Sequence, residues 1–190
     1  GMISLYPAKL LGCLGDGGLV LTNDDAMAEQ LRLMRDHGRN AEGEVVAWGV
    51  NSRLDTVQAA VLLAKFKHYE AEIKRRREIA ARYDERLSDL DDLLLPPGPE
   101  EGDHFDVYQN YELEAARRDG LREHLSAQGV GTMIQWGGKP VHRLNGLGFD
   151  HVVLPRTEAV FERCLMLPMN TSLTDDEVDY VCDMIQDFYE

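Results

Sequence analysis

The protein has 190 residues, of which 44% are hydrophobic and 28% charged, as in an ordinary folded domain rather than a disordered chain. Its formal net charge of −14 argues against a nucleic-acid partner, because a polyanion would be repelled. No apolar run approaches the roughly 18 residues of a membrane span, and no secretory signal is recognisable, so no membrane role is expected.

The three cysteines, Cys13, Cys164 and Cys182, are scattered and form neither a CxxC pair nor a zinc pattern. We therefore expect buried, reduced thiols in a cytoplasmic protein. The histidines and carboxylates show no ligand spacing either, so no metal site is predicted.

The first part of the chain predicts a strand followed by a helix. Residues 16–22 have the pattern of a turn and a short apolar strand. Residues 23–25 offer a helix cap, apolar residues then recur at helical spacing, and Gly38 is a plausible stop. Such a unit is typical of α/β folds.

A long helical pattern runs from about residue 53 to about residue 90. Its apolar face begins with Leu54, Val57, Ala60, Val61 and Ala64, and the charged residues 74–78 indicate a solvated helix face. The length favours a bent helix or two helices that join two lobes. The proline-rich residues 96–99 end the pattern and are the best boundary candidate.

The remaining residues predict short strands and helices in alternation, which indicates an α+β layer with helices packed on a small sheet. A capping box at residues 174–177 opens the last helix. The preceding elements are a strand at 107–113, a helix at 118–128, a strand at 131–136, a helix at 157–165 and a short buried segment at 165–168.

The opening segment contains the strongest chemical signal. Lys9 lies between apolar residues, Ser4 precedes it by five positions, and glycines follow. Partial burial would lower the pKa of the lysine and free its amine for Schiff-base chemistry, glycines would let the backbone approach a ligand, and a hydroxyl could bind phosphate. Taken alone the pattern is weak, and a surface lysine beside a glycine turn is the simpler interpretation.

Residues 4–18 also resemble the lysine motif of the DegT/DnrJ/EryC1/StrS aminotransferases, with Leu5 where that family often has phenylalanine. These are pyridoxal-phosphate (PLP) enzymes of fold type I that act on nucleotide-linked keto-sugars. Further stretches are similar in the same order, which makes the resemblance more specific than any single motif. They are residues 23–38, 49–60, 75–83 and 167–169.

The resemblance implies roles for four residues. Lys9 would bind PLP as an imine and then act as general acid and base, and Ser4 would hydrogen-bond the cofactor phosphate. Asn51 would reach the phosphate of the neighbouring subunit's cofactor, because the active site of this family lies at a dimer interface; a homodimer is therefore expected. Arg53 would orient that loop or contact an anionic group, and an ion pair within the loop is equally open.

Three residues are candidates for the substrate pocket. The resemblance suggests that His37 lines the sugar pocket, although a histidine that caps the helix end is the preferred interpretation. Trp136 could stack on a sugar or base, or be a half-buried strand aromatic. His142 and Pro140 match the family's His-Tyr-x-x-Pro-x-His stretch, whereas the residues before them differ, and the resemblance implies that this segment approaches the sugar. Glutamate or glutamine is the implied amino donor.

The resemblance also implies an enzyme about twice as long, whose first half supplies further cofactor contacts. We expect residues 1–92 to be a remnant of the large domain with connecting helices, and residues 93–190 to be the small C-terminal α+β domain. The chain is then an N-terminally truncated form that is inactive alone and need not hold PLP. The alternative is a catalytically silent dimerisation or binding module. A related dehydratase branch is disfavoured by Lys9, because that branch usually has histidine there.

Overall fold

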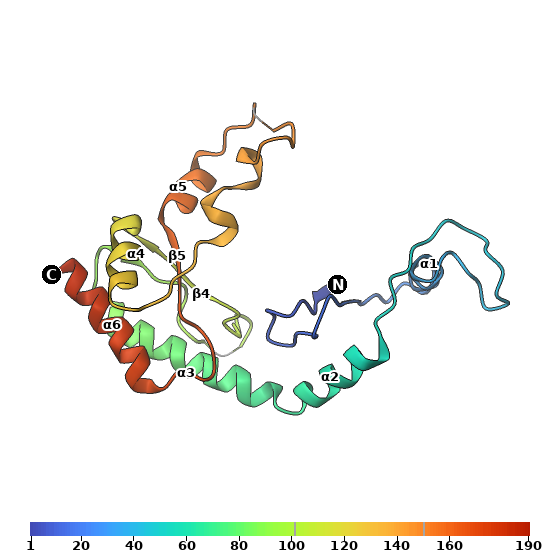
Figure 1. Cartoon of the computed structure of the whole chain (residues 1–190), viewed down its shortest axis with the longest axis horizontal. Helices are drawn as coiled ribbons and strands as arrows, with labels where there is room; N and C mark the ends of the chain where they lie inside the picture. Colours follow the sequence, from blue (N-terminus) through green and yellow to red (C-terminus); the bar gives the residue numbers. More distant parts are fainter. Residues whose placement is uncertain (101, 150) are drawn as a thin grey trace. The chain divides into compact units, whose positions relative to one another are not determined.

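A computed structural model describes residues 1–100, 102–149 and 151–190 (Figure 1). The chain divides into two compact units, Gly1–Glu70 and Ala71–Glu190. Most of helix α3 (Tyr69–Leu87) belongs to the second unit, because its buried side chains enter that unit's core. The predicted division at residue 92 concerns the domains of a whole enzyme and stays a prediction.

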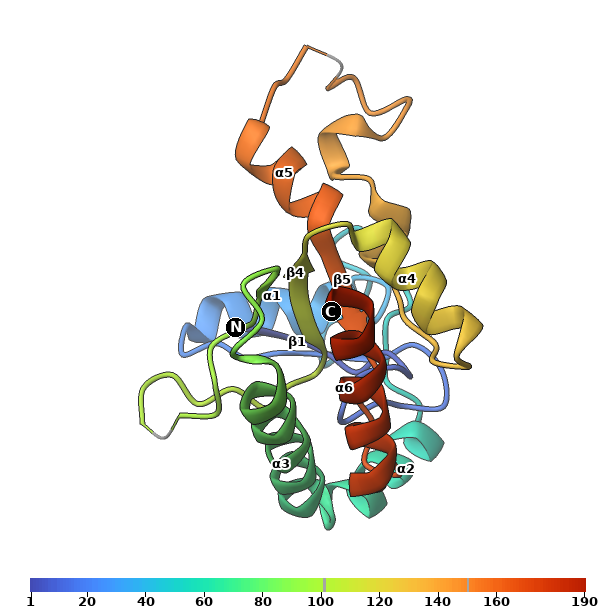
Figure 2. The same cartoon turned by 90° about the vertical axis from the view of Figure 1, so that its left-hand side faces the viewer.

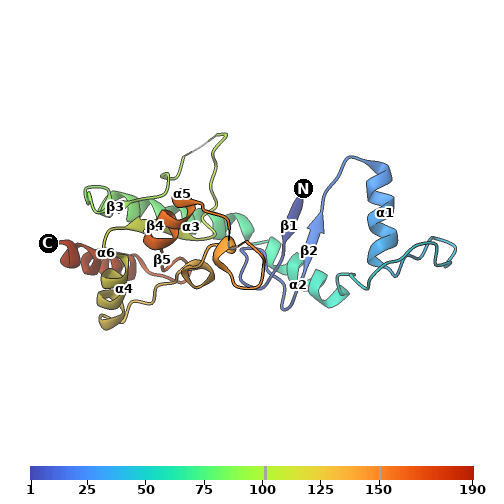
Figure 3. The same cartoon turned by 90° about the horizontal axis from the view of Figure 1, so that it is seen from above.

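The first unit begins with a two-stranded antiparallel sheet (Figure 3). Strand β1 (Met2–Ser4) pairs with β2 (Gly18–Val20), and helix α1 (Asp25–Arg35) follows. The carboxylate of Asp24 caps α1 by accepting a hydrogen bond of 3.0 Å from the Met27 amide. The predicted strand-to-helix unit is therefore confirmed.

The long helical pattern is two helices, α2 (Thr56–Phe66) and α3. The expected apolar face of α2 is not its buried face, since Val57 is 66% exposed and Leu62 is the buried residue of the helix. Leu62 lies with Leu5 and Cys13 in the small core of the first unit. Helical spacing alone does not identify the face that a neighbouring loop covers.

The second unit packs helices on a small sheet, as predicted, and this sheet has three antiparallel strands. In Figure 2, helices α3, α4 and α6 lie on one side of strands β4 and β5. The strand order is β3-β4-β5. The elements after α3 are β3 (Leu93–Leu94), β4 (Tyr111–Ala115), α4 (Arg118–Ala127), two 3-10 turns (Gln135–Gly138 and Val141–Arg143), α5 (Pro155–Arg163), β5 (Cys164–Leu167) and α6 (Asp175–Tyr189).

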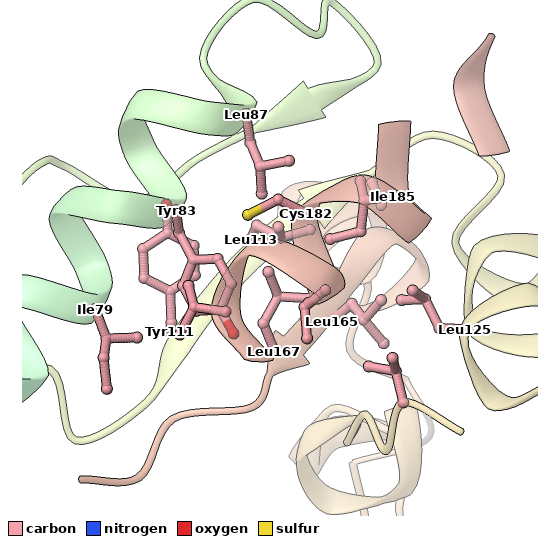
Figure 4. Packing of buried hydrophobic residues seen from close by; sticks show 14 of the residues in the cluster. Ile79, Tyr83, Leu87, Tyr111, Leu113, Leu125, Leu165, Leu167, Cys182 and Ile185 are labelled. Atoms are coloured by element: carbon pink, nitrogen blue, oxygen red, sulfur yellow. The ribbon is translucent and has the colours of Figure 1, made fainter. Parts of the chain in front are cut away.

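The core of the second unit lies between this sheet and the helices (Figure 4). Strand β4 alternates, with Tyr111, Leu113 and Ala115 buried. The rings of Tyr83 and Tyr111 meet at a centroid distance of 4.9 Å, and the Tyr83 hydroxyl donates to the Pro168 carbonyl at 2.8 Å. This bond satisfies a polar group that burial would otherwise penalise.

Two strand predictions need correction. The strand expected at 107–113 begins only at Tyr111, because Tyr108 has a φ of 47° and its amide donates to the Asp106 carboxylate. The strand expected at 131–136 is reduced to a bridge between Met133 and Met166. It stops there because Trp136 and the glycine after it have left-handed backbone angles, which end an extended chain.

The charged segment of α3 is only partly a solvated face, since Lys74 and Glu78 are exposed but the three arginines between them are partly buried. Arg75 donates to the Leu173 carbonyl at 2.6 Å, and Arg76 donates to three carbonyls, those of Tyr108, Gln109 and Met169. These bonds join α3 to the residues just before β4 and to the residues just after β5. These arginines therefore bind backbone carbonyls of distant segments. The charge pattern of the sequence alone does not reveal this role.

Helices α3 and α6 are also joined by ion pairs. Arg82 binds both carboxylate oxygens of Asp179 at 2.6 Å, and Arg86 lies 3.1 Å from the same carboxylate. Arg82 pairs further with Asp175, and Arg86 pairs with Asp183. Because these three aspartates are four residues apart, they share one face of α6.

This pairing predicts how the second unit responds to acid. The hydrogen bond from Arg82 above all, and then the charges of Arg82 and Arg86, hold the pKa of Asp179 below its ordinary value of 3.8. A lowered folded-state pKa stabilises the fold above the unfolded-state pKa, and this contribution is lost as pH falls through the folded-state pKa. Urea unfolding followed by circular dichroism should show Asp179→Asn to be less stable than wild type at pH 7, with the difference shrinking below pH 4. A difference that is constant with pH would contradict this role.

The three cysteines are free and buried, as expected. Burial raises the pKa of the Cys182 thiol to about 12, so this thiol is nearly all protonated at neutral pH and reacts poorly. Within the described ranges, no helix is both long and apolar enough to cross a membrane.

Candidate functional site

Lys9 lies in a turn directly after β1. Its amide donates to the Tyr6 carbonyl at 2.9 Å, and its side chain is exposed. The partial burial expected from its apolar neighbours is absent, because the turn directs the side chain to solvent. Its ammonium group has no partner among the residues that the structure describes. Ser4, the last residue of β1, is also exposed, so an amine and a hydroxyl are both accessible on this short segment.

The loop that carries Lys9, residues 5–17 and here named the lysine loop, is closed by backbone bonds. The Leu5 amide donates to the Gly17 carbonyl at 2.9 Å, and the Cys13 amide donates to the Leu5 carbonyl at 2.8 Å. Leu5 and Cys13 are both buried. At Gly12 a Cβ atom would lie 2.6 Å from the Pro7 carbonyl oxygen, so only glycine fits beside the turn of Lys9.

Asn51 and Arg53 form a second group of candidate residues. The Arg53 Nε donates to Asn51 Oδ1 at 3.1 Å, and an Arg53 Nη lies 3.1 Å from a carboxylate oxygen of Asp36. Arg53 therefore makes an ion pair, but with the residue that ends α1 rather than within its own loop. The Asn51 side chain is exposed, and its NH₂ group has no partner in the described part of the chain, so it is available to an anion.

His37 lies beside this group but does not cap α1 with its ring. The helix end is closed by the amides of Asp36 and Gly38, which both donate to the Leu33 carbonyl. The amide of His37 donates to the Val50 carbonyl at 3.0 Å, and its side chain is exposed. The ring is thus accessible, as a pocket role for His37 requires.

Trp136 and His142 lie in the second unit and differ in accessibility. Trp136 is 81% exposed on its left-handed turn, so it is neither half-buried nor in a strand. His142 is only 3% exposed, and its Nε2 lies 2.9 Å from Glu158 Oε1, which also accepts from Arg143. Its ring therefore holds the loop to α5 and does not face open solvent.

The hydrogen bond between His142 and Glu158 changes the pKa of the Glu158 carboxyl. It is the largest cause that lowers the pKa of the Glu158 carboxyl, with smaller contributions from the Leu154 amide and from Arg143. Glu158 thus remains a carboxylate that anchors this loop.

The candidates fall into three groups along the chain, which are Ser4 with Lys9, Asn51 with Arg53, and Trp136 with His142, and a hydrogen bond joins Arg53 to Asn51. Among residues 1–70, no hydrogen bond or ion pair joins Lys9 to Asn51 or Arg53. Nowhere in the described ranges do three or more histidine, cysteine or acidic side chains gather in a way that could hold a metal ion.

A sequence profile of the DegT/DnrJ/EryC1/StrS aminotransferase family matches residues 1–186. The chain belongs to this family. The fold of family members supports the same assignment, because the chain superposes on DesV of S. venezuelae, solved in complex with a ketimine intermediate, with a TM-score of 0.90. The two share 34% of their residues, over all of this chain and 51% of DesV. The expected fold, the α/β and α+β C-terminal part of a fold type I transferase, is confirmed.

Two curated relatives show the range of names within the family. A "pleiotropic regulatory protein" of Geobacillus stearothermophilus is 37% identical, over 98% of this chain and 50% of the relative. The dTDP-3-amino-3,4,6-trideoxy-alpha-D-glucose transaminase of Streptomyces venezuelae is 36% identical, over 98% of this chain and 49% of the relative. The chain thus spans about half the length of the curated relatives that it matches.

Lys9 of the lysine loop and Ser4 at the end of β1 fit PLP chemically. An unpaired, exposed primary amine at Lys9 can react with an aldehyde, and the accessible hydroxyl of Ser4 can donate to a phosphate. Sequence reasoning identified both residues, but it gave no role to Gln58 and Lys65, whose side chains contact the lysine loop. Their spacing of seven residues on a helix is the signal that could have revealed them.

Proposed function

We propose that this chain provides the lysine-bearing part of a PLP-dependent aminotransferase that acts on nucleotide-linked keto-sugars. The observation that carries the proposal is the exposed, unpaired amine of Lys9 on an anchored loop, in a chain that the aminotransferase profile matches over residues 1–186. The transaminase of Streptomyces venezuelae, named for a dTDP-linked amino sugar, supports the substrate class.

Each candidate residue has a defined task in this proposal. PLP, when bound, supplies an aldehyde and an electron-withdrawing ring. Lys9 would hold the aldehyde carbon through Nζ, with release of one water, and as a free amine it would carry a proton at Nζ. The Ser4 hydroxyl donates to the phosphate. Asn51 offers its NH₂ group to a phosphate while Arg53 holds its oxygen at 3.1 Å.

Substrate contacts are assigned to His37 and Trp136, whose side chains are accessible. The exposed indole of Trp136 suits stacking on a sugar or a base. His142 supports the same loop from inside through Glu158 rather than touching the sugar. Glutamate or glutamine is proposed as the amino donor.

We further propose that the protein is a cytoplasmic homodimer. Three free, buried cysteines suit a reducing compartment. The first unit exposes large apolar side chains, among them Met2, Val20 and Trp48, and such surfaces mark association sites. The same surface favours the second candidate function, a silent dimerisation or binding module.

Covalent trapping of PLP separates the two functions. The purified chain would be mixed with PLP, reduced with borohydride and digested, and the modified lysines mapped by mass spectrometry. We expect Lys9 to be labelled roughly ten times more than other exposed lysines such as Lys67, because a positioned amine reacts at a higher effective concentration.

The variant Lys9→Arg keeps the charge but should lose this selective label, whereas Lys67→Arg should keep it. Labelling spread evenly over the lysines, or unchanged total labelling in Lys9→Arg, would reject the enzyme proposal and leave the binding module.

A further inference from the structure

We infer that Gln58 and Lys65 of α2 are positioning residues that hold the lysine loop in the geometry that the Lys9 amine needs. The inference rests on the proposed function, since it assigns Lys9 the reacting amine. Neither residue touches Lys9. Both act on the part of the loop that follows it, residues 12–14.

Gln58 holds the loop through its side-chain amide. Its Oε1 accepts a hydrogen bond of 2.8 Å from the backbone amide of Leu14. Its Nε2 would lie 3.1 Å from a Cβ atom added at Gly15, so the amide also packs against the next residue of the loop. Leu14 itself is exposed, and its backbone amide donates to the side-chain oxygen of Gln58.

Lys65 holds the loop through its ammonium group. Its Nζ donates a partly buried hydrogen bond of 2.8 Å to the Gly12 carbonyl. A charged donor makes a stronger hydrogen bond than a neutral one, and partial burial protects it from competing water. Lys65 and Lys67 are both exposed residues, but the ammonium group of Lys65 is bonded to the loop.

These two residues form one face of α2 together with Leu62. Positions 58, 62 and 65 follow the i, i+4, i+7 spacing of a helix face. Leu62 is buried against Leu5, where the loop begins, and Cys13, which lies between Gly12 and Leu14. The face thus makes an apolar contact in its middle and a polar contact with the loop backbone on either side.

The hydrogen bonds at residues 12–14 affect the position of Lys9, because Gly12 packs against the turn that carries Lys9. The Cα of Gly12 approaches Tyr6 and Pro7 so closely that a Cβ atom would lie 2.7 Å and 2.6 Å from their carbonyl oxygens. The Tyr6 carbonyl in turn accepts the amide of Lys9 at 2.9 Å. A displacement of Gly12 therefore moves the turn from which the Lys9 side chain projects.

The test compares truncating and conservative variants of the full chain. Gln58→Leu and Lys65→Met remove the two bonds, whereas Gln58→Glu keeps an acceptor oxygen and Lys65→Arg keeps a charged donor. Lys67→Met is the matched control, because Lys67 is exposed on the same stretch of chain. Two quantities are measured, selective labelling of Lys9 by PLP and borohydride, and the rate of tryptic cleavage after Lys9 without PLP.

We expect Gln58→Leu and Lys65→Met each to lower selective labelling of Lys9 about tenfold, a factor that corresponds to about 1.4 kcal/mol. Tryptic cleavage after Lys9 should become faster by a similar factor, since a loosened loop enters the protease more readily. Gln58→Glu and Lys65→Arg should restore most of both properties, and Lys67→Met should change neither.

Wild-type labelling and cleavage that persist in both truncating variants would overturn the inference, as would equal effects in Lys67→Met or failure of both conservative variants to rescue. Absence of selective labelling in the wild type would instead reject the proposed function. In that case the cleavage rates still decide whether Gln58 and Lys65 hold the loop.

Discussion

Leu165→Ala is expected to lower the free energy of unfolding of the second unit by about 2–5 kcal/mol. Leu165 is fully buried in β5, where it pairs in register with Leu113 of β4. Figure 4 shows its side chain among those of Leu113, Leu125 and Leu167. Truncation removes apolar contacts from a site enclosed by sheet and helices, which cannot collapse freely around the cavity. Urea unfolding followed by circular dichroism measures the change.

The matched control is Leu147→Ala, because Leu147 is half exposed in the same unit. Truncation of this side chain should change the free energy of unfolding by less than about 0.5 kcal/mol. Similar effects of the two substitutions would show that the sheet–helix core does not dominate stability.

Gly12→Ala is expected to reduce selective PLP labelling of Lys9 by about tenfold or more. The added Cβ atom would meet the Pro7 and Tyr6 carbonyl oxygens at 2.6 and 2.7 Å, which are backbone atoms that cannot rotate away. Relief requires the turn before Lys9 to move, and local strain of about 1–3 kcal/mol is enough for such a loss. Labelling of the other lysines should be unchanged, and the unfolding of the second unit should match wild type.

Gly131→Ala is the comparison for this variant, since a Cβ atom at Gly131 meets nothing within 4 Å. It should label Lys9 as the wild type does. Full labelling in Gly12→Ala would show that the geometry of the loop does not control the reactivity of Lys9.

Local signals in the sequence were sufficient to predict several elements. The capping box at Thr174 and Glu177 is present at the start of α6, and Asp24 caps α1, because each cap depends only on residues within one turn of the helix. The break after α3 was likewise predictable, whereas the expected strand at 131–136 was wrong and strand β5 was expected only as a buried segment. The caps and the break depend on neighbours in the chain, which the sequence displays directly.

Features that depend on distant neighbours were predicted less well. The arginines at positions 75–77 appear in the sequence as a charged surface, yet Arg76 binds carbonyls from residues 108, 109 and 169. The buried face of α2 was missed for the same reason, since it is set by a loop some 50 residues earlier in the chain. Periodicity indicates that a face exists, but tertiary contacts decide which face is covered.

In the candidate site too, features set by neighbours in the chain were predictable and features set by distant residues were not. Motif order identified Lys9, Ser4, Asn51 and Arg53, and the bond from Arg53 to Asn51 lies within one short motif. The accessibility of Trp136 and the burial of His142 were not predictable, because both follow from a left-handed turn and from Glu158, which lies 16 residues after His142.

The ion pairs between α3 and α6 have a consequence for the order in which the second unit forms. Arg82 and Asp179 are 97 residues apart in the chain, and the side chains that α6 adds to the core include Val181 and Ile185. During synthesis, α3 and the sheet therefore leave the ribosome with an unfilled apolar face. The unit must wait for α6 before it closes, and contacts at such long separation form slowly. Until then, the unit exposes apolar surface of the kind that promotes aggregation.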